Sequence, residues 1–171
     1  MKIYLVGFMG SGKSTLGAAM AQKLNYSFVD LDHYIVEKEG RTIAEIFADP
    51  AKGERYFREC EKKYLSQASQ EAENIIISTG GGTPTVGDNM SYMKTMGTVV
   101  YLKTDPELLC ERLLKSKTVR PLVLGKSPDE LLEYIKNTLD EREQYYTQAN
   151  IAISNAGRQA DRVIELINYK L

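Results

Sequence analysis

Residues 7–15 carry the pattern whose chemistry is easiest to name. They read Gly-Phe-Met-Gly-Ser-Gly-Lys-Ser-Thr, and residues 7–14 fit G-x-x-x-x-G-K-[ST], the Walker A phosphate loop. Backbone N–H groups of such a loop surround phosphate oxygens, and the start of the following helix favours their negative charge. We predict that ATP is bound here, with Lys13 on the β- and γ-phosphates and Ser14 on Mg²⁺. The expected ATP-binding residues in the loop are Gly10, Ser11, Gly12, Lys13, Ser14 and Thr15.

The segments on either side of the loop support this interpretation. The apolar run 3–6 predicts a buried strand, and residues 16–24 predict a helix. A phosphate loop requires this strand–loop–helix context, whereas the alternative, a tight glycine turn beside a solvated lysine, does not. We also expect Lys13 to be exposed in the absence of ligand.

Two aspartates follow the second predicted strand, residues 27–30. Asp30 ends this strand and Asp32 comes two residues later, so along an extended chain both carboxylates would face the same way. One could act on Mg²⁺ while the other orients a substrate hydroxyl. The alternative is that Asp30 or Asp32 caps a helix or favours its positive end.

A triple glycine follows the third predicted strand, residues 74–78. Gly80, Gly81 and Gly82 have no side chains to exclude a ligand, and their N–H groups can approach one closely. The alternative is a flexible connection.

Three arginines are harder to interpret one at a time. Arg58 and Arg142 have acidic neighbours, which by itself favours a solvated helix face. Arg120 lies in a basic stretch between two predicted helices, and Pro121 disfavours helix at residue 120. In a phosphoryl-transfer fold such a segment indicates a lid, which we place at about residues 115–126. The alternative is an ordinary basic surface loop.

The remaining segments alternate between strands and helices. Strands are expected at 98–102 and 150–153, and helices after a capping box at Thr42–Glu45, over 53–72, from Asp105, from Ser127 to about 148, and from about 158. Strands separated by helices predict an α/β fold, a three-layer sandwich in which helices cover both faces of a parallel sheet. Ligands of such sheets bind at the carboxyl ends of the strands.

Length and composition set outer limits on the function. The 171 residues are expected to form one domain. A net charge of −1 does not favour a general nucleic-acid binder, and two cysteines suit a reducing cytoplasm. No apolar stretch approaches the length of a membrane span. We therefore expect a cytoplasmic protein that binds neither nucleic acid nor membrane.

Taken in order, these motifs resemble the shikimate kinase family over nearly the whole chain. The motifs are the phosphate loop, Asp30-Leu31-Asp32, Phe57-Arg58-Glu59-Cys60-Glu61, Gly80-Gly81-Gly82, Arg120-Pro121-Leu122, and Arg142 with Tyr145 and Tyr146. The resemblance implies ATP-dependent phosphorylation of the shikimate 3-hydroxyl, a step of aromatic amino-acid biosynthesis. It also implies a P-loop NTPase fold of the nucleoside monophosphate kinase type, with strand order 2-3-1-4-5 and one Mg²⁺ ion accompanying ATP.

The resemblance also implies roles for individual residues. Asp32 would bind the shikimate hydroxyls and orient or deprotonate the nucleophile, and Arg58 and Arg142 would hold the carboxylate. The glycines at 80–82 would contact the ring, within a site whose helical part spans about residues 32–72. Asp30 would act on Mg²⁺ through water, and Arg120 would reach the transferring phosphoryl from the lid. Lys13, Asp32 and Arg120 are therefore the expected catalytic residues, in a protein expected to be a monomer.

The adenine side departs from the family pattern. Family members often place an arginine before the lid arginine, where it can stack on adenine, but Lys115 and Lys117 stand in that segment here. Arg112 comes earlier, on the predicted helix. We name Arg158, near the start of the last helix, as a residue that contacts ATP.

Two other functions remain open from the sequence. Another small-molecule kinase of the same fold, for gluconate or a nucleoside monophosphate, would share the phosphate loop. A non-enzymatic ATP-binding module would share it too, but would need neither an acceptor base nor a carboxylate clamp.

Overall fold

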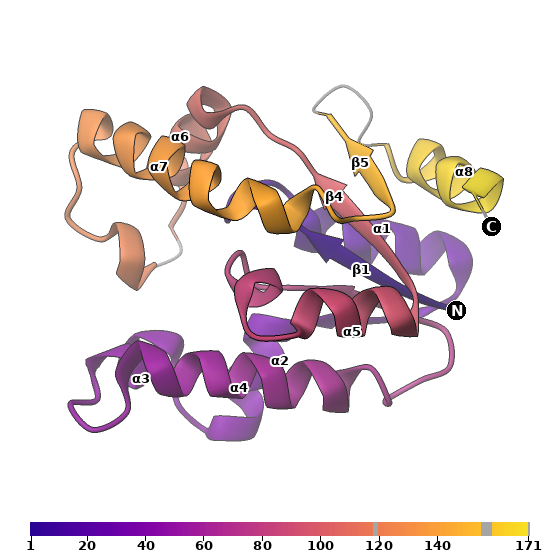
Figure 1. Ribbon diagram of the computed structural model, residues 1–171, viewed down its shortest axis with the longest axis horizontal. Coiled ribbons are helices and arrows are strands. Elements are labelled where there is room, and N and C mark those ends of the chain that lie inside the picture. The colour runs from indigo at the N-terminus through magenta and orange to yellow at the C-terminus, as the bar shows by residue number, and fades with distance from the viewer. Residues whose placement is uncertain (118–119, 155–158, 171) are drawn as a thin grey trace.

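A computed structural model describes residues 1–117, 120–154 and 159–170 and places five strands in one parallel sheet (Figure 1). The strands are β1 (Lys2–Val6), β2 (Ser27–Asp30), β3 (Ile75–Ser78), β4 (Thr98–Leu102) and β5 (Ile151–Ile153). Their order is β2-β3-β1-β4-β5, which confirms the order implied by the resemblance. Strand β1 is central, with Tyr4 aligned with Ile77 of β3 and Val99 of β4.

Helices connect the strands and cover the sheet (Figure 1). They are α1 (Lys13–Leu24), α2 (Leu31–Glu39), α3 (Ile43–Ala48), α4 (Gly53–Ala68), α5 (Asn89–Met96), α6 (Pro106–Lys115), α7 (Pro128–Tyr146) and α8 (Ala160–Lys170), with short 3-10 turns η1 (Thr83–Thr85) and η2 (Pro121–Val123).

The alternation of side chains along β1 divides the core into two layers. Tyr4 and Val6 face a cluster built with α2, α4, α5 and α7, whereas Ile3 and Leu5 face a second cluster built with α1 and α8. Successive residues of a strand point to opposite faces, so a continuous apolar strand is buried by helices on both sides. This is the predicted three-layer arrangement.

A third cluster supports the far side of the phosphate loop. Phe8 is 1% exposed and packs with Leu109 of α6 and Ile135 of α7. Because Phe8 belongs to the loop, this cluster fastens the loop to the two helices that flank residues 115–126.

Several element boundaries differ from the sequence expectation. Helix α1 begins at Lys13, three residues before the predicted start, because the loop turns directly into the helix. Helix α4 ends at Ala68 instead of residue 72. Here Ser69 donates its hydroxyl to the Leu65 carbonyl and accepts a hydrogen bond from the buried Tyr4 hydroxyl. Helix α5 was not predicted, and its sequence has little amphipathic pattern. The capping box at Thr42 is present as predicted, and Ser127, where a helix start was predicted, forms a second capping box with Glu130.

Among the helices of the described ranges, none is long and apolar enough to span a bilayer.

Candidate active site

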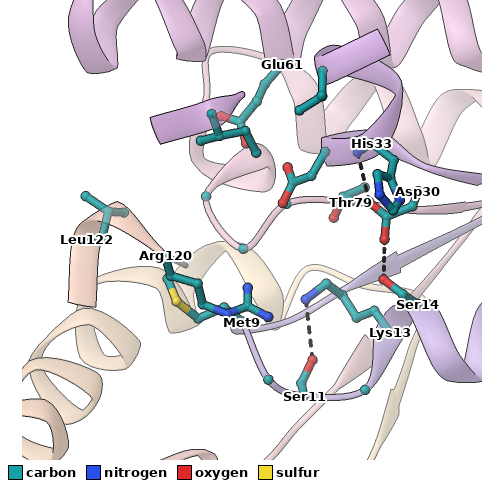
Figure 2. Close-up of a pocket in the computed structure, with 18 of the residues that line it drawn as sticks. Met9, Ser11, Lys13, Ser14, Asp30, His33, Glu61, Thr79, Arg120 and Leu122 are labelled. Atoms are coloured by element: carbon teal, nitrogen blue, oxygen red, sulfur yellow. Dashed lines mark hydrogen bonds between the residues drawn. The ribbon is translucent and has the colours of Figure 1, made fainter. Parts of the chain in front are cut away.

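One large pocket, about 1,210 Å³ in volume, opens at the carboxyl edge of the sheet. It is lined by the phosphate loop, the aspartates after β2, the triple glycine after β3, α4, and the segment around Arg120. Figure 2 shows Lys13, Glu61 and Arg120, which come from three of these segments, around a common space. Every predicted site residue in the described ranges therefore lies in or beside one cavity, although these residues come from across the chain.

The phosphate loop is already shaped as an anion cradle. Gly12 caps α1 with φ of +92°, a conformation that side-chain-bearing residues rarely adopt. The Lys13 amine turns back over the loop and donates to the carbonyls of Gly7, at 2.8 Å, and Phe8, at 3.0 Å.

Lys13 is buried, which makes the expectation of an exposed lysine wrong. Its exposed fraction is 7% because these two carbonyls and the surrounding pocket walls enclose it. Burial lowers the pKa of the Lys13 ammonium to about 8, and the nearby Arg120 guanidinium acts in the same direction against the attraction of Asp32.

Oxygen donors meet at the start of α1. The Ser14 hydroxyl donates to Asp30 Oδ2 and lies 3.1 Å from the Ser78 hydroxyl (Figure 2). Hydroxyl and carboxylate oxygens are the donors that Mg²⁺ prefers. Within residues 1–117, 120–154 and 159–170, no three His, Cys, Asp or Glu side chains are grouped to hold a metal. The donor set thus fits an ion completed by phosphate and water oxygens, not a protein cage.

Asp30 also caps a helix, and for this reason the prediction that Asp30 and Asp32 lie along an extended chain is wrong. Asp30 is the N-cap of α2 and accepts the His33 backbone N–H at 3.2 Å. Asp32 is therefore in the first turn of a helix and not in an extended chain. The capping alternative holds for Asp30, and its other oxygen accepts from Ser14, so one carboxylate contacts the starts of both α1 and α2.

Asp32 is a half-buried residue whose carboxylate has one buried, unpartnered oxygen. Its Oδ1 atom is inaccessible to solvent and finds no hydrogen-bond partner among the residues that the structure describes. Burial raises the pKa of the Asp32 carboxyl to about 6, and the carboxylates of Glu61 and Asp30 push it in the same direction. An unpartnered acceptor in a pocket is costly unless a ligand hydrogen-bonds it.

Arg58 is held from two sides on α4. Its Nη1 donates to Glu61 Oε2 at 2.7 Å, and its Nη2 donates to Glu54 Oε1 at 3.0 Å. Its side chain is 21% exposed and lines the pocket, so the solvated-face alternative is wrong for this arginine.

Arg142 enters the pocket from α7. Its guanidinium lies over the Phe8 ring, 5.6 Å from the ring centroid, and its Nη1 is buried without a hydrogen-bond partner in the described part of the chain. One turn later, Tyr146 donates its hydroxyl to the Gly81 carbonyl at 2.6 Å and ties α7 to the triple glycine. Arg142 thus presents a free donor where the solvated-face alternative predicted only water.

Arg120 reaches the pocket from the residue before η2 and points toward Lys13 (Figure 2). Its backbone is extended, as Pro121 predicted, and its Nε is buried with no hydrogen-bond partner within residues 1–117, 120–154 and 159–170.

The triple glycine lies against the functional side chains themselves. A Cβ atom on Gly80 would be 3.0 Å from Asp32 Oδ1, and one on Gly81 would be 3.1 Å from Arg142 Nη1. A Cβ on Gly82 would overlap Arg58, with Cζ at 2.7 Å. The glycines are required here because other side chains occupy the space, which the sequence alone did not reveal.

Sequence reasoning missed some pocket residues. Glu61 is part of the motif around Arg58, but its sequence context indicated no role for it. Because it lies three residues after Arg58 on a helix, the two side chains are nevertheless expected to be in contact. Ser78 gave no signal of its own. Arg112, which the sequence places on the preceding helix, lines the pocket and donates to the Gly10 carbonyl at 3.2 Å. Arg158 lies outside the described residues.

The chain resembles known proteins over nearly its full length. A family model described as "Shikimate kinase" matches residues 9–170. The shikimate kinase of Azobacteroides pseudotrichonymphae is 44% identical over 170 residues, 99% of each chain. A crystal structure of shikimate kinase from Bacteroides thetaiotaomicron superposes with a TM-score of 0.91 at 40% identity, covering 98% of both chains. Shikimate kinase from Acinetobacter baumannii in complex with shikimate gives 0.86 at 35% identity, covering 98% of this chain and 93% of the other.

Proposed function

This chain belongs to the shikimate kinase family, an ATP-using kinase family, and from that premise we propose how its residues phosphorylate shikimate. One observation carries the proposal. The same cavity contains a phosphate loop, an unpartnered carboxylate oxygen on Asp32 and an unpartnered guanidinium nitrogen on Arg142. An acceptor that offers a hydroxyl to the first and a carboxylate to the second would satisfy both orphaned groups.

ATP occupies the side of the pocket formed by the loop. Its β- and γ-phosphates accept from the N–H groups of residues 10–15, and Lys13 exchanges its carbonyl partners for phosphate oxygens. Arg112, beside the Gly10 carbonyl, lies close enough to the loop to contact the nucleotide. Arg158 remains a proposed ATP contact.

A single Mg²⁺ ion fits the oxygens near Ser14. Ser14 would ligate the ion directly, while Asp30 and Ser78 would hold its water ligands. When bound, such an ion would neutralise negative charge on the phosphates of ATP.

Shikimate occupies the opposite side, between α2, α4 and the triple glycine. Arg58 and Arg142 converge on its carboxylate, since forked guanidinium groups match that shape. Phe47 and Phe57, whose ring centroids are 5.2 Å apart, supply an apolar wall for the ring. Asp32 then accepts a hydrogen bond from the 3-hydroxyl, orients its oxygen toward the γ-phosphate and takes up its proton.

Arg120 stabilises the charge of the transferring phosphoryl. It belongs to the proposed lid, about residues 115–126, of which 115–117 and 120–126 are described. Closing this segment over both substrates would exclude water and so suppress wasteful ATP hydrolysis. We further propose a single domain with its acceptor site within residues 32–72, acting as a cytoplasmic monomer in aromatic amino-acid biosynthesis.

An acceptor screen tests the proposed function directly. ADP release is coupled to a spectrophotometric readout with shikimate, gluconate, AMP or CMP as acceptor, at saturating ATP and Mg²⁺. Turnover with shikimate alone is expected, since the paired arginines and Asp32 match a carboxylate-bearing polyol. Turnover with gluconate or a nucleotide would favour another kinase of this fold, and turnover with none would favour an ATP-binding module.

A further inference from the structure

The hydroxyl group of Thr83, a residue outside the expected site, donates a hydrogen bond to the buried Glu61 carboxylate of the pocket. Thr83, the first residue of η1, is fully buried and donates its hydroxyl to Glu61 Oε1 at 2.6 Å. The other oxygen, Oε2, accepts from Arg58 Nη1 at 2.7 Å. Each oxygen of the Glu61 carboxylate thus has one donor, and the two donors come from different elements.

The burial of Glu61 makes its orientation depend on these donors. Its side chain is 1% exposed, so water cannot replace a lost partner. A buried carboxylate with an unfilled acceptor site reorients toward whatever donor remains. Here that donor is Arg58, which would be drawn out of its present position against Gly82.

Thr83 is itself fixed in place. Its carbonyl accepts from Asn89 Nδ2 at 3.0 Å and from the Val86 backbone N–H at 3.2 Å. Asn89 is 2% exposed and starts α5, so a helix packed on the sheet anchors the turn. The line of contacts runs from α5 through η1 and Glu61 to Arg58.

We propose that Thr83 is a positioning residue for the acceptor's carboxylate, acting through Glu61 to aim Arg58. This inference rests on the proposed function, in which Arg58 binds that carboxylate. In this role, the turn after the triple glycine fixes the direction of the Arg58 side chain before the substrate binds. The conformational entropy lost by this long side chain on binding is then smaller.

Thr83→Val removes the hydroxyl and keeps the branched shape. We expect the shikimate Kd, measured by calorimetry, to rise about tenfold or more, as for the loss of a hydrogen bond to a charged group. The shikimate KM should rise in parallel, while kcat and the ATP KM change less than about twofold because the phosphate loop is untouched. Thr83→Ser keeps the donor and should restore the parent Kd. Thr138→Val, a buried threonine on α7 outside the pocket, is the matched control and should leave both KM values unchanged.

A double-mutant cycle tests the route through Arg58. In an Arg58→Ala background, Thr83→Val should change the shikimate Kd less than about twofold, because the residue it positions is gone. If Arg58→Ala alone leaves shikimate binding unchanged, the proposed role of Arg58 fails and the positioning role fails with it. If Arg58→Ala weakens binding but Thr83→Val does not, only the positioning role is overturned. Three other outcomes would also overturn the positioning role. They are a Thr83→Val effect that persists fully in the Arg58→Ala background, an equal rise of both KM values, and a failure of Thr83→Ser to restore the parent Kd.

Discussion

The guanidinium of Arg58 lies directly against the backbone of Gly82, so that a Cβ on residue 82 would be 2.7 Å from Arg58 Cζ. The glycine and the arginine are 24 residues apart in sequence and come from different elements. Gly82 has φ of −88°, which any residue can adopt, so only the space beside it demands glycine. The close contact fixes the position of Arg58, one of the two arginines of the proposed carboxylate clamp, against the backbone of Gly82.

Gly82→Ala should therefore displace Arg58 without straining the backbone. We expect a shikimate Kd at least about tenfold weaker, the loss of a charge-assisted contact, with ATP affinity unchanged. Gly40→Ala is the contrasting control, since Gly40 has φ of +64° and no atom near its Cβ position. It should lower the free energy of unfolding by about 1–2 kcal/mol and leave shikimate binding intact. Calorimetric titrations and urea unfolding of both variants provide the comparison.

Arg142→Ala isolates the carboxylate clamp better than Arg58→Ala does. Arg142 Nη1 has no hydrogen-bond partner among the described residues, whereas removing Arg58 leaves the buried Glu61 without its cation. Both variants should bind shikimate about tenfold or more weakly. Only Arg58→Ala should also lower the free energy of unfolding, by about 1–3 kcal/mol. Arg142→Lys should recover part of the affinity, because an ammonium cannot form the fork. Unchanged shikimate affinity in both alanine variants would exclude the clamp.

Asp32→Asn should lower the turnover rate and, at pH 8, raise the free energy of unfolding. Turnover should fall by about 10²–10⁴-fold, since an amide cannot accept the proton, while ATP still binds. The folded-state pKa of about 6 lies above the ordinary value of 3.8, so the folded protein binds this proton more tightly than the unfolded chain. The tighter binding of this proton stabilises the folded protein fully below pH 3.8, and this stabilisation is lost as the pH rises through 6. At pH 8 the variant, which has no charge to bury, should be more stable by on the order of 2–3 kcal/mol.

The same carboxyl sets the acid limb of the parent's pH profile. With Asp32 required as a base, kcat/KM for shikimate should fall tenfold per unit below about pH 6. A parent profile that is flat from pH 5 to pH 8 would exclude Asp32 as the base.

Lys13→Met should abolish turnover and keep the fold, with methionine filling the space that alanine would leave beside the Gly7 and Phe8 carbonyls. The lowered pKa of Lys13, about 8, adds a more specific test. Bound phosphates favour the charged amine, so ATP binding at pH 8 should take up about half a proton. Calorimetry in buffers of different ionisation enthalpy measures this uptake, which should vanish in Lys13→Met. Equal uptake by parent and variant would assign the proton to another group.

Arg120→Ala should lower kcat on the order of 10³-fold and change either KM much less, because the arginine acts on charge that develops in the transition state. Steady-state kinetics with both substrates varied gives the three constants. A kcat within a few-fold of the parent would exclude this role, even with shikimate as the substrate.

Local spacing and hydrophobic patterning were sufficient to predict the layered architecture and the phosphate loop. Spacing within residues 7–15 is local information, and a continuous apolar strand such as 3–6 requires helices on both faces. Capping boxes at Thr42 and Ser127 likewise depend on residues three positions apart. Strand order and the roles of the distant aspartate and arginines came from the family resemblance.

The tertiary structure alone decided how the acceptor side is built. Whether Arg58 faces solvent or the pocket, why residue 82 is glycine, and what Thr83 binds all depend on contacts between separate elements. The burial of Lys13 depends on the way the loop folds back over its own amine. These properties depend on which side chains are buried together away from water. Local sequence spacing cannot indicate this, because the segments that enclose the buried groups are far apart in the chain.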